Sequence, residues 1–191
     1  MNHNNQKYSL GVVHGRFQIL HNDHMKYLLA GKELCEHLII GITNPDPSLT
    51  KDSDINPHRS TPIANPLTYY ERYIMIEAAL KEKGLNSSEF SIVPFPINIP
   101  KLIKYYVPMD ATFFLTIYDD WGKQKKEYFE SLGVNIHVLW EVTSEEKGLS
   151  SSDIRKSMIT GVSWEQMVPP SVATIMKKWN IPLRLKNLNS K

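Results

Sequence analysis

The sequence lacks several features that would place it in a specialised class of protein. Among its 191 residues there is one cysteine, Cys35, so no disulfide can form within the chain. No apolar run approaches the roughly 20 residues that span a bilayer, and the polar start MNHNNQKYS is not a secretory signal. The net charge is only +2, which does not indicate a nucleic-acid partner. We therefore expect a cytoplasmic protein with no membrane segment.

Apolar, β-branched runs alternate with helical patterns along the chain. The predicted strands cover 8–13, 37–43, 90–95, 112–118 and 134–140. The predicted helices cover 22–34, 68–83, 120–132, 151–160 and 170–179, with a weaker segment near 100–107. This order predicts an α/β fold with a mostly parallel sheet between helices, and such sheets bind ligands at the carboxyl ends of their strands.

The length fits a single domain, residues 1–191. We expect a C-terminal helical segment over about residues 150–180, followed by a basic tail, 181–191, that is solvated and partly frayed. The connection 43–66 is polar and carries five prolines. A loop of this length is usually functional or disordered, and the sequence leaves open whether it is a lid or a tolerated insertion.

The stretch GVVHGRFQILHNDH joins the first strand to the first helix. Gly15 lets the backbone approach a ligand closely, and Arg16 offers a planar fork of donors suited to phosphate. The helix that begins near Asn22 presents free N–H groups to the same space. His21 and His24 are three residues apart and face the same way at that helix start. The pair could also bind zinc, but the spacing is not that of the metalloprotease motif, and no metal site is predicted.

A second phosphate-binding pattern occurs late, in KGLSSSDIRKSMITG. Ser150 and Asp153 match the pattern that caps a helix, so one interpretation is simply a well-capped helix. However, Ser150, Ser152 and Arg155 also gather at a helix start that follows a strand. Two such sites on one parallel sheet suggest a polyphosphate held between them.

These residues resemble known signatures. HGRFQILHNDH resembles the G-R-F-Q-P-x-H-x-G-H signature of the HxGH nucleotidyltransferases, and LSSSDIR resembles their I-S-x-T-x-I-R motif. NPLTYYERYIMIEAAL and WEQMVPPSV resemble segments of the archaeal-type nicotinamide-nucleotide adenylyltransferases. The resemblance implies a Rossmann-like, doubly wound, parallel five-stranded sheet with helices on both faces. It also implies an enzyme that transfers a nucleoside monophosphate from an NTP, ATP or CTP, to a small acceptor and releases pyrophosphate.

The resemblance also implies the site residues. The catalytic residues would be His21, His24 and Arg16. The NTP-binding residues would be Gly15, Arg16, Phe17, Gln18, His21, His24, Lys26, Ser150, Ser152 and Arg155. Mg²⁺ would accompany the triphosphate as a cofactor, because positioning and charge stabilisation carry most of such a transfer.

Two kinds of departure bear on the acceptor. Asp23 replaces the glycine between the two histidines, and Ile19 replaces a proline. The turns after the second and fourth strands read GITNPDP and FLTIYDDWG, where the adenylyltransferases have G-S-A-Q-like and T-G-N-like turns. The candidate acceptor-binding residues are Asn44, Asp46, Arg72, Tyr118, Asp119 and Trp121.

The first hypothesis is an NMN adenylyltransferase-like enzyme that makes a dinucleotide such as NAD. The second is a cytidylyltransferase that activates another small phosphate, phosphonate or alcohol. The third is a non-catalytic nucleotide-binding module. The sequence leaves the oligomeric state open, a homo-oligomer included.

Overall fold

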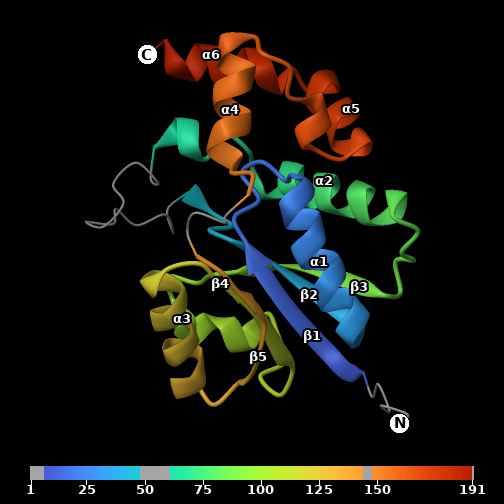
Figure 1. Ribbon diagram of the computed structural model, residues 1–191, viewed down its shortest axis with the longest axis vertical. Helices are drawn as coiled ribbons and strands as arrows, with labels where there is room; N and C mark the ends of the chain where they lie inside the picture. The colour runs from blue at the N-terminus through green and yellow to red at the C-terminus, as the bar shows by residue number, and fades with distance from the viewer. Residues whose placement is uncertain (1–6, 48–60, 144–147, 191) are drawn as a thin grey trace.

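A computed structural model describes residues 7–47, 61–143 and 148–190 of the chain. Within these ranges, five strands form one parallel sheet in the order β3-β2-β1-β4-β5 (Figure 1). The strands are β1 (Tyr8–Gly15), β2 (Cys35–Thr43), β3 (Phe90–Phe95), β4 (Thr112–Ile117) and β5 (Asn135–Glu141). The predicted parallel five-stranded α/β fold is confirmed, with most boundaries within two residues.

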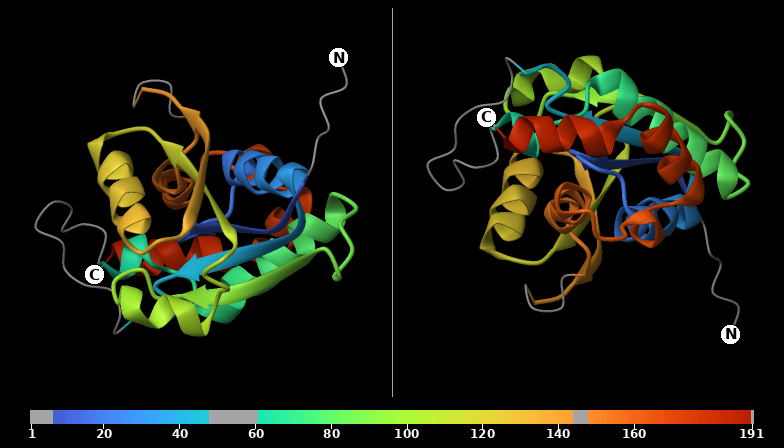
Figure 2. Two further views of the ribbon diagram at one scale, coloured as in Figure 1. Left: turned by 90° about the horizontal axis from the view of Figure 1, so that it is seen from below. Right: turned by 90° about the horizontal axis from the view of Figure 1, so that it is seen from above.

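Helices cover both faces of the sheet. The α-helices are α1 (Asn22–Leu34), α2 (Tyr69–Glu82), α3 (Asp120–Ser131), α4 (Ser151–Thr160), α5 (Pro170–Lys178) and α6 (Ile181–Asn189). Short 3₁₀ segments are η3 (Pro62–Ala64), η4 (Pro100–Tyr105) and η6 (Glu165–Met167). In Figure 1, α4, α5 and α6 lie above the carboxyl ends of the strands, and Figure 2 shows α6 crossing that end of the sheet.

The two faces of the sheet bury separate apolar cores. Successive strand residues point to opposite faces, so Val13 joins the core with α1, α2 and the C-terminal helices, whereas Val12 joins the core with α3 and η4. Both valines are fully buried. A strand covered on both faces is apolar almost throughout, which is why the strands could be predicted from their composition.

The C-terminal tail differs from the prediction, because residues 181–189 form α6 rather than a frayed, solvated end. Ile181 and Leu185 are four residues apart and are both fully buried. Arg184 donates to both carboxylate oxygens of Glu71 on α2, at 2.9 and 2.7 Å. The tail is basic in composition, but its apolar residues have helical spacing, and that spacing was the missed signal.

The long connection after β2 is described only at its ends. Residues 48–60 lie outside the described part of the chain, so the question of a lid is not tested. The later end is fixed by Gln18, whose side-chain amide donates to the Leu67 carbonyl and accepts from the Leu67 N–H, both at 2.9 Å. Among the described residues, no helix is both long and apolar enough to span a membrane.

His14, on β1, is a polar residue inside the core beneath α3. Its ring stacks on Phe95 with the centroids 4.9 Å apart, and it meets Phe129 edge-on at 5.3 Å. Neither ring nitrogen has a hydrogen-bond partner among the described residues. Burial, and then the positive charge of Lys125, lower the pKa of His14 well below its ordinary value. His14 is therefore neutral at pH 7, and its unpaired nitrogens destabilise the folded chain.

We predict that His14→Phe stabilises the fold, because it keeps the ring stack and removes two unpaired nitrogens. The expected gain in the free energy of unfolding at pH 7 is about 1–3 kcal/mol. In wild type, the unfolded chain takes up a proton on His14 below pH about 6.5 while the folded chain does not, so stability falls on acidification. His14→Phe removes the contribution of this residue to the dependence of the free energy of unfolding on pH. Urea denaturation at pH 7, 6 and 5 measures both effects.

The matched control is His37→Phe, because both ring nitrogens of His37 are hydrogen-bonded, to the Ser88 carbonyl and the Ser91 hydroxyl. This variant is expected to give no stabilisation. A His14→Phe protein that is less stable than wild type, with an unchanged pH slope, would show that the buried nitrogens are satisfied.

Candidate functional site

The site lies where β1 and β4 part at their carboxyl ends. The two strands pair only at Gly11–Thr112 and Val12–Phe113. Beyond these pairs the Tyr27 hydroxyl from α1 lies between them. It accepts the His14 N–H at 3.4 Å and donates to the Phe114 carbonyl at 2.7 Å. The sheet therefore opens at its switch point, where ligands of such folds bind.

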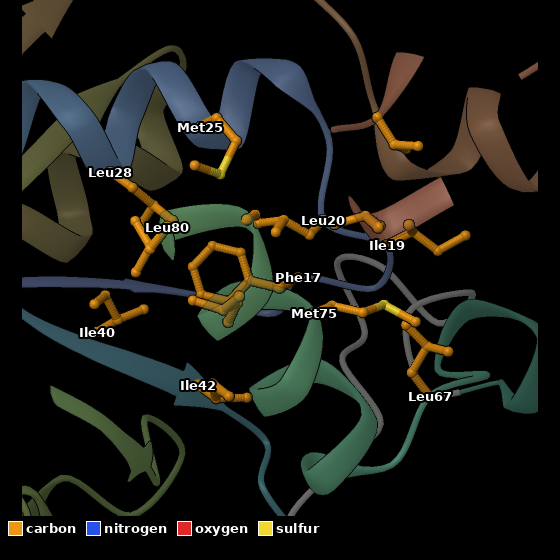
Figure 3. Packing of buried hydrophobic residues seen from close by; sticks show 14 of the residues in the cluster. Phe17, Ile19, Leu20, Met25, Leu28, Ile40, Ile42, Leu67, Met75 and Leu80 are labelled. Carbon is orange, nitrogen blue, oxygen red and sulfur yellow. The ribbon is translucent and has the colours of Figure 1, made fainter. Parts of the chain in front are cut away.

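The turn from β1 to α1 points its apolar side chains into the core. Phe17, Ile19 and Leu20 are essentially fully buried, and Figure 3 shows the Phe17 ring among core side chains that include Met75 and Leu80. A Cβ added at Gly15 would lie 2.9 Å from that ring, so the glycine makes room for it. The Phe17 and Gln18 side chains are thus committed to the fold, and a contact of either residue with nucleotide would use backbone atoms.

Arg72 on α2, which was predicted to bind the acceptor, contacts the backbone of two turns. The residue is 2% exposed, and its guanidinium donates to the backbone carbonyls of Arg16 at 3.0 Å, Thr43 at 2.8 Å and Asn44 at 2.8 Å. Burial lowers its pKa to about 10, which leaves it cationic at neutral pH. Arg72 therefore joins the turns after β1 and β2, and its contact with the acceptor stays a prediction.

Arg155 and Ser151 on α4 hold the same turn from the other side. The Arg155 guanidinium donates to the Gln18 carbonyl and, at 2.9 Å, to the Ser152 hydroxyl. The Ser151 hydroxyl donates to the Ile19 carbonyl at 2.9 Å. The two sequence motifs predicted to bind phosphate thus lie against each other. Ser151 was not among the predicted site residues, although it stands inside the LSSSDIR motif.

The predicted histidine pair forms at the start of α1. The rings of His21 and His24 are stacked with their centroids 3.7 Å apart. The His21 Nδ1 accepts the His24 backbone N–H at 3.3 Å, which makes His21 the N-cap of α1. Because Nδ1 is an acceptor, the proton of a neutral His21 ring is on Nε2, which can donate to a ligand.

Both histidines are neutral at pH 7. Burial lowers the pKa of His21 to about 4. Burial also lowers the pKa of His24 well below its ordinary value, and the charge of Arg16, together with the charge that His21 gains in acid, lowers it further. The His24 Nδ1 is buried and has no partner among the described residues. The rings of His24 and Phe17 pack in a T-shaped arrangement with their centroids 5.1 Å apart.

Two other residues predicted to bind the nucleotide, Ser150 and Lys26, lie at the starts of α4 and α1. Ser150 is the N-cap of α4, and its hydroxyl exchanges hydrogen bonds with Asp153 in a capping box. Lys26 is exposed and forms an ion pair with Asp23 at 2.6 Å.

The predicted acceptor residues lie beyond the carboxyl ends of β2 and β4. Asn44 has a left-handed backbone (φ 48°), and its side-chain oxygen accepts from the Asn98 amide at 3.2 Å. Asp46 is exposed. The Tyr118 hydroxyl accepts from the Trp140 indole at 2.9 Å, and Asp119 caps α3 by accepting the Gly122 N–H at 2.8 Å. Trp121 is in the first turn of α3, and its side chain lies outside the described part of the structure.

No three His, Cys, Asp or Glu side chains gather as a metal-ion site among the described residues. The arrangement instead offers cations, neutral imidazoles and two helix amino ends. Such groups can bind and stabilise a polyanion.

Comparison with known proteins identifies the family. The cytidylyltransferase-like family model matches residues 12–157. Phosphonoformate cytidylyltransferase of Streptomyces viridochromogenes is 46% identical over 92% of this chain and 95% of its own. Nicotinamide-nucleotide adenylyltransferase of Thermococcus sibiricus is 31% identical over 93% of this chain and 88% of its own.

Solved structures show the same fold at low identity. A bifunctional NMN adenylyltransferase/ADP ribose pyrophosphatase from Francisella tularensis superposes with a TM-score of 0.67 at 16% identity over 95% of this chain. This chain spans about half, 52%, of that protein. A putative nicotinate-nucleotide adenylyltransferase from Vibrio parahaemolyticus superposes with a TM-score of 0.56 at 15% identity, and the match covers 96% of this chain and 98% of that one. The match to the family model and the relative that is 46% identical show that the chain belongs to the cytidylyltransferase-like family of nucleotidyltransferases.

Proposed function

We propose that the protein is a cytidylyltransferase that transfers CMP from CTP to a small phosphonate-bearing acceptor and releases pyrophosphate. The observation that carries the proposal is the 46% identity to phosphonoformate cytidylyltransferase, which extends over 92% of this chain and 95% of that protein. The adenylyltransferase relatives are about 30% identical over similar lengths. This was the second hypothesis from the sequence, and the unusual turns after β2 and β4 also support it.

The described groups suit the transfer step. An acceptor oxygen attacks the α-phosphorus of CTP and forms a new P–O bond, while the bond to the β-phosphate oxygen breaks and pyrophosphate leaves. The Nε2–H of neutral His21 and the free N–H groups at the start of α1 would donate to the phosphate oxygens as their charge shifts. The Arg16 guanidinium, whose charge acts on His24, would add a cation at the same place.

Mg²⁺ is expected to arrive with the triphosphate. Mg²⁺ in such sites is usually held by substrate phosphates, waters and one or two carboxylates, so phosphate oxygens would supply much of its coordination. When bound, the ion would neutralise charge on the leaving pyrophosphate.

A second candidate is NMN adenylyltransferase activity. It rests on the Thermococcus relative, which is 31% identical over nearly the whole of this chain. The two candidates share the transfer chemistry and differ in base and acceptor, so substrate preference separates them.

The proposal is tested by pairing CTP or ATP with phosphonoformate or NMN, in the presence of Mg²⁺, and measuring pyrophosphate release. We expect kcat/KM for CTP with phosphonoformate to exceed that for ATP with NMN by roughly 100-fold or more, because a site that hydrogen-bonds its substrate rejects one that lacks the matching groups. Preference for ATP with NMN would overturn the proposal in favour of the second candidate. Release with neither pair would exclude phosphonoformate and NMN as the acceptors.

His24→Ala is expected to lower kcat about 100-fold or more, the scale of losing one preorganised donor in the transition state. Calorimetry should show a smaller change in CTP affinity. The control is His137→Ala, because His137 is on β5 and bonds to the Tyr8 hydroxyl near the start of β1, away from the site. Wild-type turnover by His24→Ala would remove this residue from the catalytic group.

Arg72→Lys should destabilise the protein and impair both substrates, since one ammonium cannot reach three carbonyls that a guanidinium fork holds. We expect a loss of roughly 1–3 kcal/mol in the free energy of unfolding, from carbonyls left unpaired, and a rise of about tenfold or more in the acceptor KM, because the Asn44 turn is released. Arg184→Lys, in an ion pair whose arginine side chain is 35% exposed, is the matched control. Unchanged stability and acceptor KM in Arg72→Lys would show that the three bonds from the Arg72 guanidinium to backbone carbonyls are dispensable.

A further inference from the structure

Asp23 stands between the two site histidines, where the family signature has glycine. Its carboxylate acts on the neighbouring His21 by charge and also reaches across to the segment ahead of α4. One oxygen accepts the Leu149 backbone N–H at 2.6 Å, a contact between residues 126 apart in sequence. The other pairs with the Lys26 ammonium at 2.6 Å. These two bonds hold the pKa of Asp23 below its ordinary value although burial opposes that shift.

Gly148 is shaped to receive this carboxylate. A Cβ added at Gly148 would lie 2.2 Å from an Asp23 carboxylate oxygen, far inside van der Waals contact. A side chain at residue 148 would displace the Asp23 carboxylate from this position. Asp23 and Gly148 therefore form a complementary pair, one from each phosphate-binding segment.

The contact fixes one helix start relative to another. Leu149 precedes Ser150, the N-cap of α4, while Asp23 is in the first turn of α1. A carboxylate that accepts a backbone N–H makes a strong, charge-assisted hydrogen bond. Ser151 and Arg155 attach α4 to the turn before α1, but their bonds begin inside the helix. Asp23 holds the segment that leads into it.

We infer that Asp23 is a positioning residue, whose carboxylate ties the Gly148–Leu149 segment to α1 and so sets the separation of the two helix starts that grip the triphosphate. The inference rests on the proposed nucleotidyltransferase function. A glycine at position 23 would give up this tie, and the segment ahead of α4 would be free to move. Loss of this contact would weaken nucleotide binding more than it weakens acceptor binding.

The test compares Asp23→Gly, which restores the residue of the family signature, with Asp23→Asn. The asparagine carbonyl can still accept the Leu149 N–H, whereas glycine cannot. We expect Asp23→Gly to weaken CTP binding roughly tenfold by calorimetry with Mg²⁺ present, the scale of one hydrogen bond to a charged group. Asp23→Asn should stay within about threefold. Glu33→Gln, an exposed residue near the far end of α1, controls for loss of charge from the helix.

Hydrogen exchange supplies a readout independent of turnover. The Leu149 amide should lose about tenfold of its protection in Asp23→Gly and keep it in Asp23→Asn. Gly148→Ala should weaken CTP binding in wild type and add little in the Asp23→Gly background, since the two changes break the same contact. Thermal melts of each variant confirm that it is folded.

Wild-type CTP affinity and a protected Leu149 amide in Asp23→Gly would overturn the inference. Equal losses of CTP affinity in Asp23→Gly and Asp23→Asn would also overturn it, because they would assign the effect to charge. A wild-type protein that binds neither CTP nor ATP would overturn the proposed function instead, and Leu149 exchange would still decide whether Asp23 fixes the segment.

Discussion

The site depends on how the backbone carbonyls of the turn after β1 are satisfied. These carbonyls belong to neither the sheet nor the helix, so each needs another donor. Arg72 bonds the carbonyl of Arg16, Arg155 bonds that of Gln18, and Ser151 bonds that of Ile19. Donors from α2 and α4 thereby hold the turn on both sides. The shape of the loop is set by buried cations, and the amino end of α1 stays available for a ligand.

Placing two guanidinium groups and two imidazoles around one turn has an electrostatic result. Both arginines bond backbone carbonyls, which do not neutralise their charge, and both remain cationic despite the lowered pKa that burial causes. The histidines respond to the same surroundings by staying neutral. Asp23 and Asp153 also act on His21 by charge, so the cations of this region stand beside two carboxylates in a chain whose net charge is only +2.

Strands and most helices could be predicted because apolar periodicity is a local property of the sequence. The histidine pair and the two capped helix starts were predictable for the same reason, since each lies within a few residues. The contacts that assemble the site are not local: Arg72 reaches carbonyls 28 to 56 residues away, and Asp23 reaches Leu149 across 126 residues. Sequence alone could not show whether Arg72 faces a ligand or the fold. The sequence also could not show that Asp23 bonds to the Leu149 N–H, because a carboxylate near a triphosphate suggests repulsion until its partners are known.

The Tyr27 hydroxyl between β1 and β4 has a mechanical consequence. The sheet consists of two ladders, β3-β2-β1 and β4-β5, that share two residue pairs. At the carboxyl end, one phenol oxygen on α1 bonds both edges. A displacement of α1 would strain a bond to each ladder, so the position of the helix that carries His24 is coupled to the opening of the sheet.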